Sequence, residues 1–198
     1  TRFDLTKPIF PQLLDPTLTL EEYLGFITEP KIMPDPTKQI RIFQSDFFEF
    51  FSSTQWWHVP AVWLPVKFLI LTIVTSYLPE NYTFWRAVAF YLFGIFHWTI
   101  TEYFLHRFLF HVDAKLPTNG WCFGLHFLIH GIHHAFPQDP GRLVFPIFNA
   151  SIVAIVMLSY FNLFLWWPDA LYTLAGFGIA YIAYDLFHYY THHSGAHF

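Results

Sequence analysis

Four long apolar stretches follow one another along the chain from residue 59 onward. Each is close to the roughly 20 residues that an α-helix needs to cross about 30 Å of hydrocarbon. They cover residues 59–78, 85–105, 143–166 and 170–190. This pattern predicts an all-α integral membrane protein with four transmembrane helices.

Short polar turns at residues 79–81 and 166–169 join these stretches in pairs. A chain that turns so briefly must cross the bilayer and return at once, so we expect two helical hairpins that begin and end on the same side. Most basic residues fall on that side, and the positive-inside rule makes it cytoplasmic. These residues are Arg2, Lys7, Lys31, Lys38, Arg41, Arg107, Lys115 and Arg142.

Repeated prolines interrupt residues 1–55, which we interpret as a peripheral lead-in to a membrane domain at residues 56–198. Inside the lead-in, Thr19 and Glu22 have the spacing of a capping box. They predict one short helix that lies along the membrane surface. A helical turn embedded in a loop is the alternative.

Composition agrees with a membrane protein, because 55% of the residues are hydrophobic and only 12% are charged, against about 25% charged in soluble domains. The net charge is -4, and no run of Lys or Arg could neutralise a series of phosphates, which excludes nucleic-acid binding. Lys67 lies inside the first apolar stretch. We expect its side chain to reach toward the interface or to bond within the bundle.

Histidine is the residue type that points to chemistry, and the chain contains 12 of them. Three groups stand at or between the cytoplasmic ends of the predicted spans, so the topology brings them to one face of the membrane. Buried imidazoles need partners there, and transition metals such as iron and zinc provide them. The predicted metal ligands are His106, His111, His130, His133, His134, His188 and His192.

Two of these groups fit shared helical faces. At about 100° per residue, His130, His133 and His134 lie on one face of a helix, and His188 and His192 share another.

The third group does not fit an ideal helix, because His106 and His111 are separated by about 140° around its axis. Both can serve one site only if the helix ends or bends between them. We therefore expect the second span to break near Arg107.

Four further residues are candidates for an outer layer around the ligands. Glu102 and Asp185 lie about one turn before predicted ligands, where a carboxylate can accept the second ring N–H of a ligating histidine. His126 extends the stripe of the middle group, and His193 points away from the face of the last one. Isolated histidines are interpreted as hydrogen-bonded structural residues, namely His58, His97 and His197.

The spacings His106-x4-His111, His130-x2-His133-His134 and His188-x3-His192, set between paired spans, resemble those of the fatty acid hydroxylase superfamily of membrane di-metal oxygenases. Residues 102–111, 126–134, 142–146 and 185–194 resemble the fatty acid 2-hydroxylase branch rather than sterol desaturases or carotene hydroxylases. The opening residues 4–8 are similar to the segment that joins the haem domain to the membrane domain in that family. The resemblance spans nearly the whole chain.

This resemblance implies a centre of two non-haem iron ions, for which zinc can substitute. It implies that a b-type cytochrome supplies electrons, and that dioxygen provides the oxygen inserted at carbon 2 of a long acyl chain, in a ceramide or a fatty acid. It further implies an endoplasmic reticulum location with the metal site facing the cytoplasm. We expect an apolar groove lined by Phe104, Phe108 and Phe123 to lead toward the metals.

Two departures from the family pattern affect these expectations. No b-type cytochrome domain precedes this region, and His193 and His197 do not reproduce the last His-x2-His-His cluster of the family. We therefore expect the C-terminal part of the site to be missing from this chain and the metal site to be under-ligated.

Three other functions remain to be compared with the hydroxylase. A desaturase or sterol oxidase would use the same di-metal chemistry, and a non-catalytic subunit of a membrane complex could retain the same scaffold. A metal transporter is disfavoured because its ligands should lie near mid-membrane.

Overall fold

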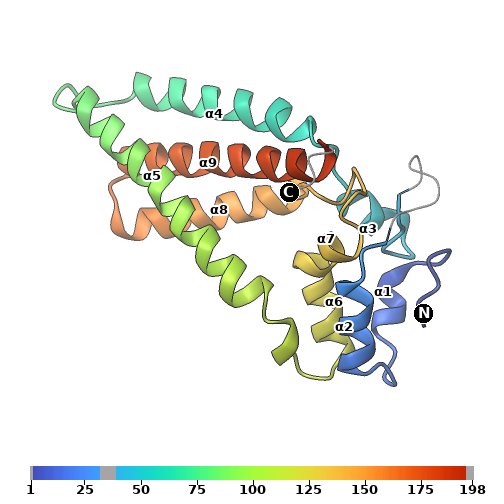
Figure 1. The fold of residues 1–198 in the computed structure, drawn as a ribbon. Coiled ribbons are helices and arrows are strands. Elements are labelled where there is room, and N and C mark those ends of the chain that lie inside the picture. The colour runs from blue at the N-terminus through green and yellow to red at the C-terminus, as the bar shows by residue number, and fades with distance from the viewer. Residues whose placement is uncertain (1, 32–38, 195–198) are drawn as a thin grey trace.

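The computed structural model describes residues 2–31 and 39–194, and all regular structure within them is helical (Figure 1). Four helices are long and apolar enough to cross a membrane, which confirms the predicted fold class. They are α4 (His58–Ser76), α5 (Phe84–Leu105, continued by a π-helical turn at His106–Phe110), α8 (Ile147–Phe164) and α9 (Trp167–His193).

The last span is longer than predicted, because it begins at Trp167 rather than near residue 170 and continues to His193. Pro168 stands in its first turn, where a missing N–H costs no helical hydrogen bond. His188 and His192 therefore project from the final turns of one continuous helix, which fixes their separation.

Helix α9 is the central element of the bundle; it packs against α4, α5 and α8 (Figure 1). Its contact with α5 depends on small residues, as is common between membrane helices. A methyl group added at Gly94 would collide with the carbonyl oxygen of Thr173, and one added at Gly176 would collide with that of Tyr91. The two backbones thus approach without intervening side chains.

An ion pair fastens the start of α5 to the start of α9. The buried carboxylate of Asp169 accepts hydrogen bonds from Arg86 Nε at 3.0 Å and Arg86 Nη2 at 2.6 Å. The Tyr82 hydroxyl donates a further bond to Asp169 at 2.8 Å. The buried charge is stabilised because both carboxylate oxygens have hydrogen-bond partners, two of these bonds coming from a cation.

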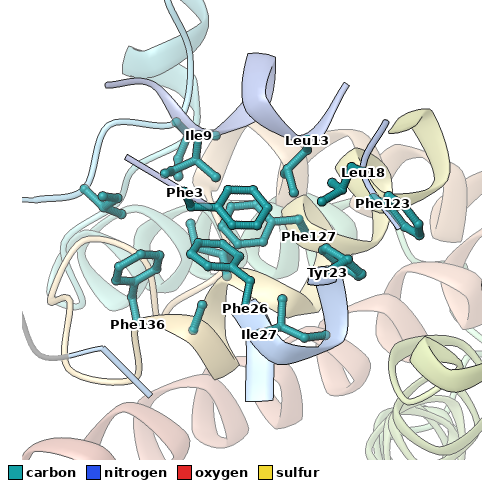
Figure 2. Packing of buried hydrophobic residues seen from close by; sticks show 14 residues of the cluster. Phe3, Ile9, Leu13, Leu18, Tyr23, Phe26, Ile27, Phe123, Phe127 and Phe136 are labelled. Carbon is teal, nitrogen blue, oxygen red and sulfur yellow. The ribbon is translucent and has the colours of Figure 1, made fainter. Parts of the chain in front are cut away.

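A second core lies outside the membrane helices. Short helices α1 (Ile9–Leu13) and α2 (Leu20–Thr28) pack against α6 (Gly120–His126), a π-helical turn at Phe127–Gly131, and α7 (Ile132–Ala135). We call this unit the cap. Its buried side chains include Phe3, Ile9, Leu13, Leu18, Tyr23, Phe26, Ile27, Phe123, Phe127 and Phe136 (Figure 2).

Helix α2 begins with the predicted capping box. Thr19 Oγ1 accepts from the Glu22 N–H at 3.2 Å, and the Glu22 carboxylate accepts from the Thr19 N–H at 2.9 Å. The predicted short helix is confirmed, and its apolar face is buried in protein, because Tyr23 and Phe26 pack against Phe123 and Phe127 (Figure 2). Its place along the membrane surface stays a prediction. The face is apolar because it covers the histidine-bearing segment.

Arg142 joins the lead-in to the membrane bundle. Its guanidinium donates to Ser52 O and Oγ at 2.7 Å each and to Ile40 O at 2.9 Å, and it pairs with Glu49 of the short helix α3 (Asp46–Phe51). Asp139 accepts from the Ile40 N–H at 3.0 Å. The connection between α7 and α8 is therefore fixed against residues 40–52.

Candidate metal centre

We expected the second span to break near Arg107, and this prediction is wrong. The span instead widens into a π-helical turn at His106–Phe110. The His111 N–H donates to the His106 carbonyl at 3.2 Å, which is the i to i+5 bond of this geometry. Residues five apart then face the same way. As a result, the Nε2 atoms of His106 and His111 lie 3.1 Å from each other.

A second π-helical turn, Phe127–Gly131, carries His130. It closes with the Ile132 N–H bonded to the Phe127 carbonyl. Gly131 is required on its inner side, because a β-carbon there would lie 2.8 Å from the hydroxyl of Tyr23. Single π-helical turns are frequent at functional sites, and here two of them position histidines.

The histidines form two groups of potential metal ligands, which we call the first and second triads. In each triad, one ring nitrogen from every member lies within 4.8 Å of the others. The second triad contains a close pair, with His133 Nε2 and His188 Nε2 3.2 Å apart. The first triad is His106, His111 and His130, and the second is His133, His188 and His192.

His134 lies between the predicted ligands of different elements. Its ring centre is 4.6 Å from that of His130 and 5.1 Å from that of His111. The rings of His130 and His133 are 5.5 Å apart and connect the two triads. The structure thus gathers all seven predicted ligands into one cluster, while their binding of metal remains a prediction.

The cluster is held in the form that binds cations. Burial, followed by the neighbouring imidazoles, lowers the pKa of His130 and of His133 to about 2. The pKa of His134 is lowered for the same reasons. These rings are therefore neutral near pH 7, and a neutral imidazole has a free lone pair for a metal.

Several of these nitrogens lack a protein partner. Among the described residues, His130 Nε2, His133 Nδ1 and His134 Nε2 are buried without a hydrogen bond. Leaving such atoms unpaired is costly. Packing several neutral imidazoles so closely also costs free energy when the protein has no partner for them. A shared metal partner resolves both costs, so the residues present fit a metal centre.

An apolar cavity of about 270 Å³ leads from these histidines into the bundle. His106, His130, His133 and His188 stand at one end. The walls come from all four spans and from residues 142–146; they include Trp63, Trp98, Val144, Val153, Phe177 and Tyr181. The cavity therefore connects the membrane interior with the cluster.

The predicted groove residues do not line this cavity. Phe104 and Phe108 are 55% and 60% exposed on the outer side of α5, and Phe123 is fully buried in the cap. The expectation was wrong because every face of a membrane helix is apolar, so hydrophobicity does not distinguish an inner wall from lipid-facing surface.

Known proteins share the sequence and the fold of this chain. No protein-family profile matches the chain. The dihydroceramide fatty acyl 2-hydroxylase FAH2 of Arabidopsis thaliana is 38% identical over 190 residues, which cover 96% of this chain and 75% of that protein. The chain belongs to the fatty acid 2-hydroxylase family. The resemblance predicted from the histidine spacings is thereby confirmed, and the protein is an enzyme of the monooxygenase class.

Other relatives agree. The ceramide very long chain fatty acid hydroxylase SCS7 of Saccharomyces cerevisiae is 34% identical over 193 residues, 96% of this chain and 48% of that protein. The solved hydroxylase domain of Scs7p superposes with a TM-score of 0.84 at 32% identity, covering 96% of this chain and 70% of that chain. The hydroxylase described here thus spans about half the length of that yeast relative and about three quarters of the plant one.

In the hydroxylase, His126 lies beside the histidine cluster, and its ring is hydrogen-bonded to other residues. The His126 Nε2–H donates to the Phe110 carbonyl at 2.9 Å, which leaves Nδ1 to accept from the Tyr23 hydroxyl at 2.6 Å. Burial raises the pKa of Tyr23 well above its usual range, so the hydroxyl keeps its proton. Both ring nitrogens of His126 are therefore engaged in holding the end of the first π-helical turn.

The other outer candidates of the hydroxylase differ from one another. Glu102 lies beside His106, with Oε1 and Nδ1 3.4 Å apart, as expected of a carboxylate behind a ligand. Asp185 does not take the expected place. It accepts from the Phe145 N–H at 3.2 and 3.3 Å and from the Tyr181 hydroxyl at 3.3 Å, because its side chain is turned toward the segment that precedes α8.

The remaining histidines of the hydroxylase lie apart from the cluster. His193 stacks on Tyr189 with ring centres 4.1 Å apart and hydrogen-bonds to its carbonyl at 3.2 Å. His58 packs against Trp57, and His97 lies among aromatic rings that include Phe161. His197 falls outside the described residues.

Proposed function

We propose that this hydroxylase inserts one oxygen atom from dioxygen at carbon 2 of a long acyl chain that is amide-linked, as in ceramide. The observation that carries the proposal is the position of both triads at one end of an apolar cavity that opens through the membrane bundle. The names of the plant and yeast relatives, which specify dihydroceramide and ceramide, support this substrate class.

The proposed ligands divide between two metal ions. The first triad would hold one ion and the second triad the other, with His134 placed to complete the first. Iron is proposed as the active metal, and zinc as a substitute that keeps the structure without the oxygen chemistry. Bound iron would supply the oxidising power, with one oxygen atom entering the C–H bond and the other leaving as water at the expense of two electrons and two protons.

The residues of the chain itself position the substrate. An acyl chain has no polar group to recognise, so the walls of the cavity must select it by shape and by burial of methylenes. The neutral histidines at the end of the cavity remain fixed by their own supports, such as Glu102 behind His106. The depth to which the acyl chain enters the cavity then determines which carbon atom lies at the histidine cluster.

The proposed source of electrons is a b-type cytochrome, and the proposed location is the endoplasmic reticulum with the cluster toward the cytoplasm. The predicted topology supports this, since the histidines and most basic residues share one side. On that side, a soluble electron donor and a membrane lipid could both reach the cluster.

Mass spectrometry of lipids tests the proposal directly. The natural protein would be expressed in cells without endogenous 2-hydroxylase, and ceramides that gain one oxygen at carbon 2 of the acyl chain are expected. A His133→Ala variant should abolish the product, whereas His58→Ala should retain it, because His58 lies apart from the cluster and packs against Trp57. Loss of two hydrogens instead of gain of oxygen would identify a desaturase and reject the hydroxylation proposed here.

A further inference from the structure

Lys67 occupies the midpoint of α4, equally far from His58 and from Ser76. Its side chain is turned inward, toward α9. The ammonium lies over Gly178 and fills the space that any side chain at position 178 would need. It also lines the apolar cavity. A cation thus stands halfway along a membrane helix and faces the space proposed for the acyl chain.

This ammonium has no hydrogen-bond or ion-pair acceptor within residues 2–31 and 39–194, although it faces the cavity. The expectation that Lys67 would bond within the bundle is therefore not met. Unpaired cations at this depth are costly, and membrane proteins retain them where they line a pathway or a water-filled space. Water in the cavity is the remaining partner for Lys67, since a cavity of about 270 Å³ can hold several molecules.

The depth of Lys67 can be compared with the length of an acyl chain. Gly178 precedes His188 by ten residues, which is roughly 15 Å along α9. Half of a bilayer core of about 30 Å is also about 15 Å. An acyl chain of ordinary bilayer length with carbon 2 at the histidines would therefore end close to Lys67. The cavity continues beyond this point, along Ile70 and Leu171.

We propose that Lys67 sets the acyl-chain length that the hydroxylase prefers, an inference that rests on the proposed function. A chain that ends before Lys67 leaves the water around the ammonium in place. A longer chain must displace that water and put methylenes against an unpaired cation, which is unfavourable. The lysine thus discriminates against very long chains although the cavity extends far enough to admit them.

The test is a Lys67→Met substitution, which keeps a long flexible side chain and removes the charge. Cells expressing the natural full-length protein would be supplied with ceramides whose acyl chains are shorter and longer than one bilayer leaflet. Burying one methylene against an apolar wall favours binding about fourfold. The ratio of long-chain to short-chain 2-hydroxylated product is therefore expected to rise about fourfold or more in Lys67→Met.

Two further variants make the result decisive. Lys67→Arg keeps the charge and should keep the wild-type ratio. Lys67→Gln removes the charge and should raise the ratio of long-chain to short-chain product, so it replaces Lys67→Met as the test if the methionine variant does not fold. An unchanged ratio in a neutral variant with wild-type metal content would overturn the proposal, and so would an equal loss at every chain length. Absence of any 2-hydroxylated product from the wild-type protein would instead reject the proposed function itself.

Discussion

The hydroxyl of Tyr23 donates a hydrogen bond to Nδ1 of His126 across 2.6 Å, although the two residues are 103 positions apart in sequence. Because His126 then donates to the Phe110 carbonyl, a residue of α2 is connected through one imidazole to the turn that pairs His106 with His111. The cap therefore takes part in shaping the first triad, in addition to covering it.

Removing this support should weaken metal binding without removing a ligand. His126→Phe is expected to lower metal affinity about 10–100-fold, the usual effect of losing a residue behind the ligands. His126→Gln can accept from Tyr23 and donate to Phe110 with its amide, and should restore most of the affinity. Competition with a chelator measures both. Equal losses from the two variants would show that the imidazole itself acts as a ligand.

Tyr23→Phe should lower the free energy of unfolding by about 1–3 kcal/mol, because His126 Nδ1 would be buried without a donor. Tyr77→Phe is the matched control, since Tyr77 is largely exposed and should tolerate the change. Thermal unfolding in detergent compares them. Identical midpoints for the two variants would mean that the Tyr23 bond contributes nothing measurable.

The two carboxylates beside the cluster should separate into different roles. Glu102→Gln is expected to reduce metal retention about 10–100-fold, because its carboxylate lies behind His106. Asp185→Asn should retain metal but lose stability, because the carboxylate holds the Phe145 N–H. Metal content measured by mass spectrometry after dialysis distinguishes them. Metal loss from Asp185→Asn alone would reverse the assignment.

His188→Ala should abolish hydroxylation, because a methyl group cannot replace a predicted metal ligand of the second triad. His97→Ala changes a histidine that packs among aromatic rings away from the cluster and should preserve the product. The lipid products are measured in cells. Comparable losses from both would indicate that histidines act here through folding rather than through metal.

Glycine substitutions should report on the contact between α5 and α9. Gly176→Ala forces a methyl group against the Tyr91 carbonyl and is expected to cost at least about 1–3 kcal/mol through overpacking. Gly25→Ala has open space around it and should stabilise α2 by up to about 1 kcal/mol. Their unfolding midpoints should therefore move in opposite directions. A stabilising effect of Gly176→Ala would show that the helices can separate at little cost.

The sequence predicted the spans and the histidine cluster because both depend on local patterns. Apolar length identifies a membrane helix, and ring spacing identifies a shared face. The five-residue spacing of His106 and His111 correctly predicted an irregular helix. It did not predict whether the helix would break or widen. Only the i to i+5 bond at His111 decides between these outcomes.

Contacts between distant segments could not be predicted in the same way. The sequence around Tyr23 does not predict its hydrogen bond to His126, and the sequence around Asp185 does not predict its hydrogen bond from the Phe145 N–H. Phe104 and Phe108 were misassigned because lipid and a lipid-binding cavity select the same side chains. The charge of Lys67 is evident from the sequence, whereas its orientation toward Gly178 depends on how α4 packs against α9.

A π-helical turn is equivalent to one extra residue inserted into an α-helix. Because this extra residue lies between His106 and His111, the same residues wound as an ordinary α-helix would place the two imidazoles about 140° apart around the axis. The most regular version of this helix would therefore be one that cannot pair the two imidazoles. Substitutions that favour ordinary α-helix over residues 106–110 would therefore separate the two imidazoles while making the backbone hydrogen bonds more regular.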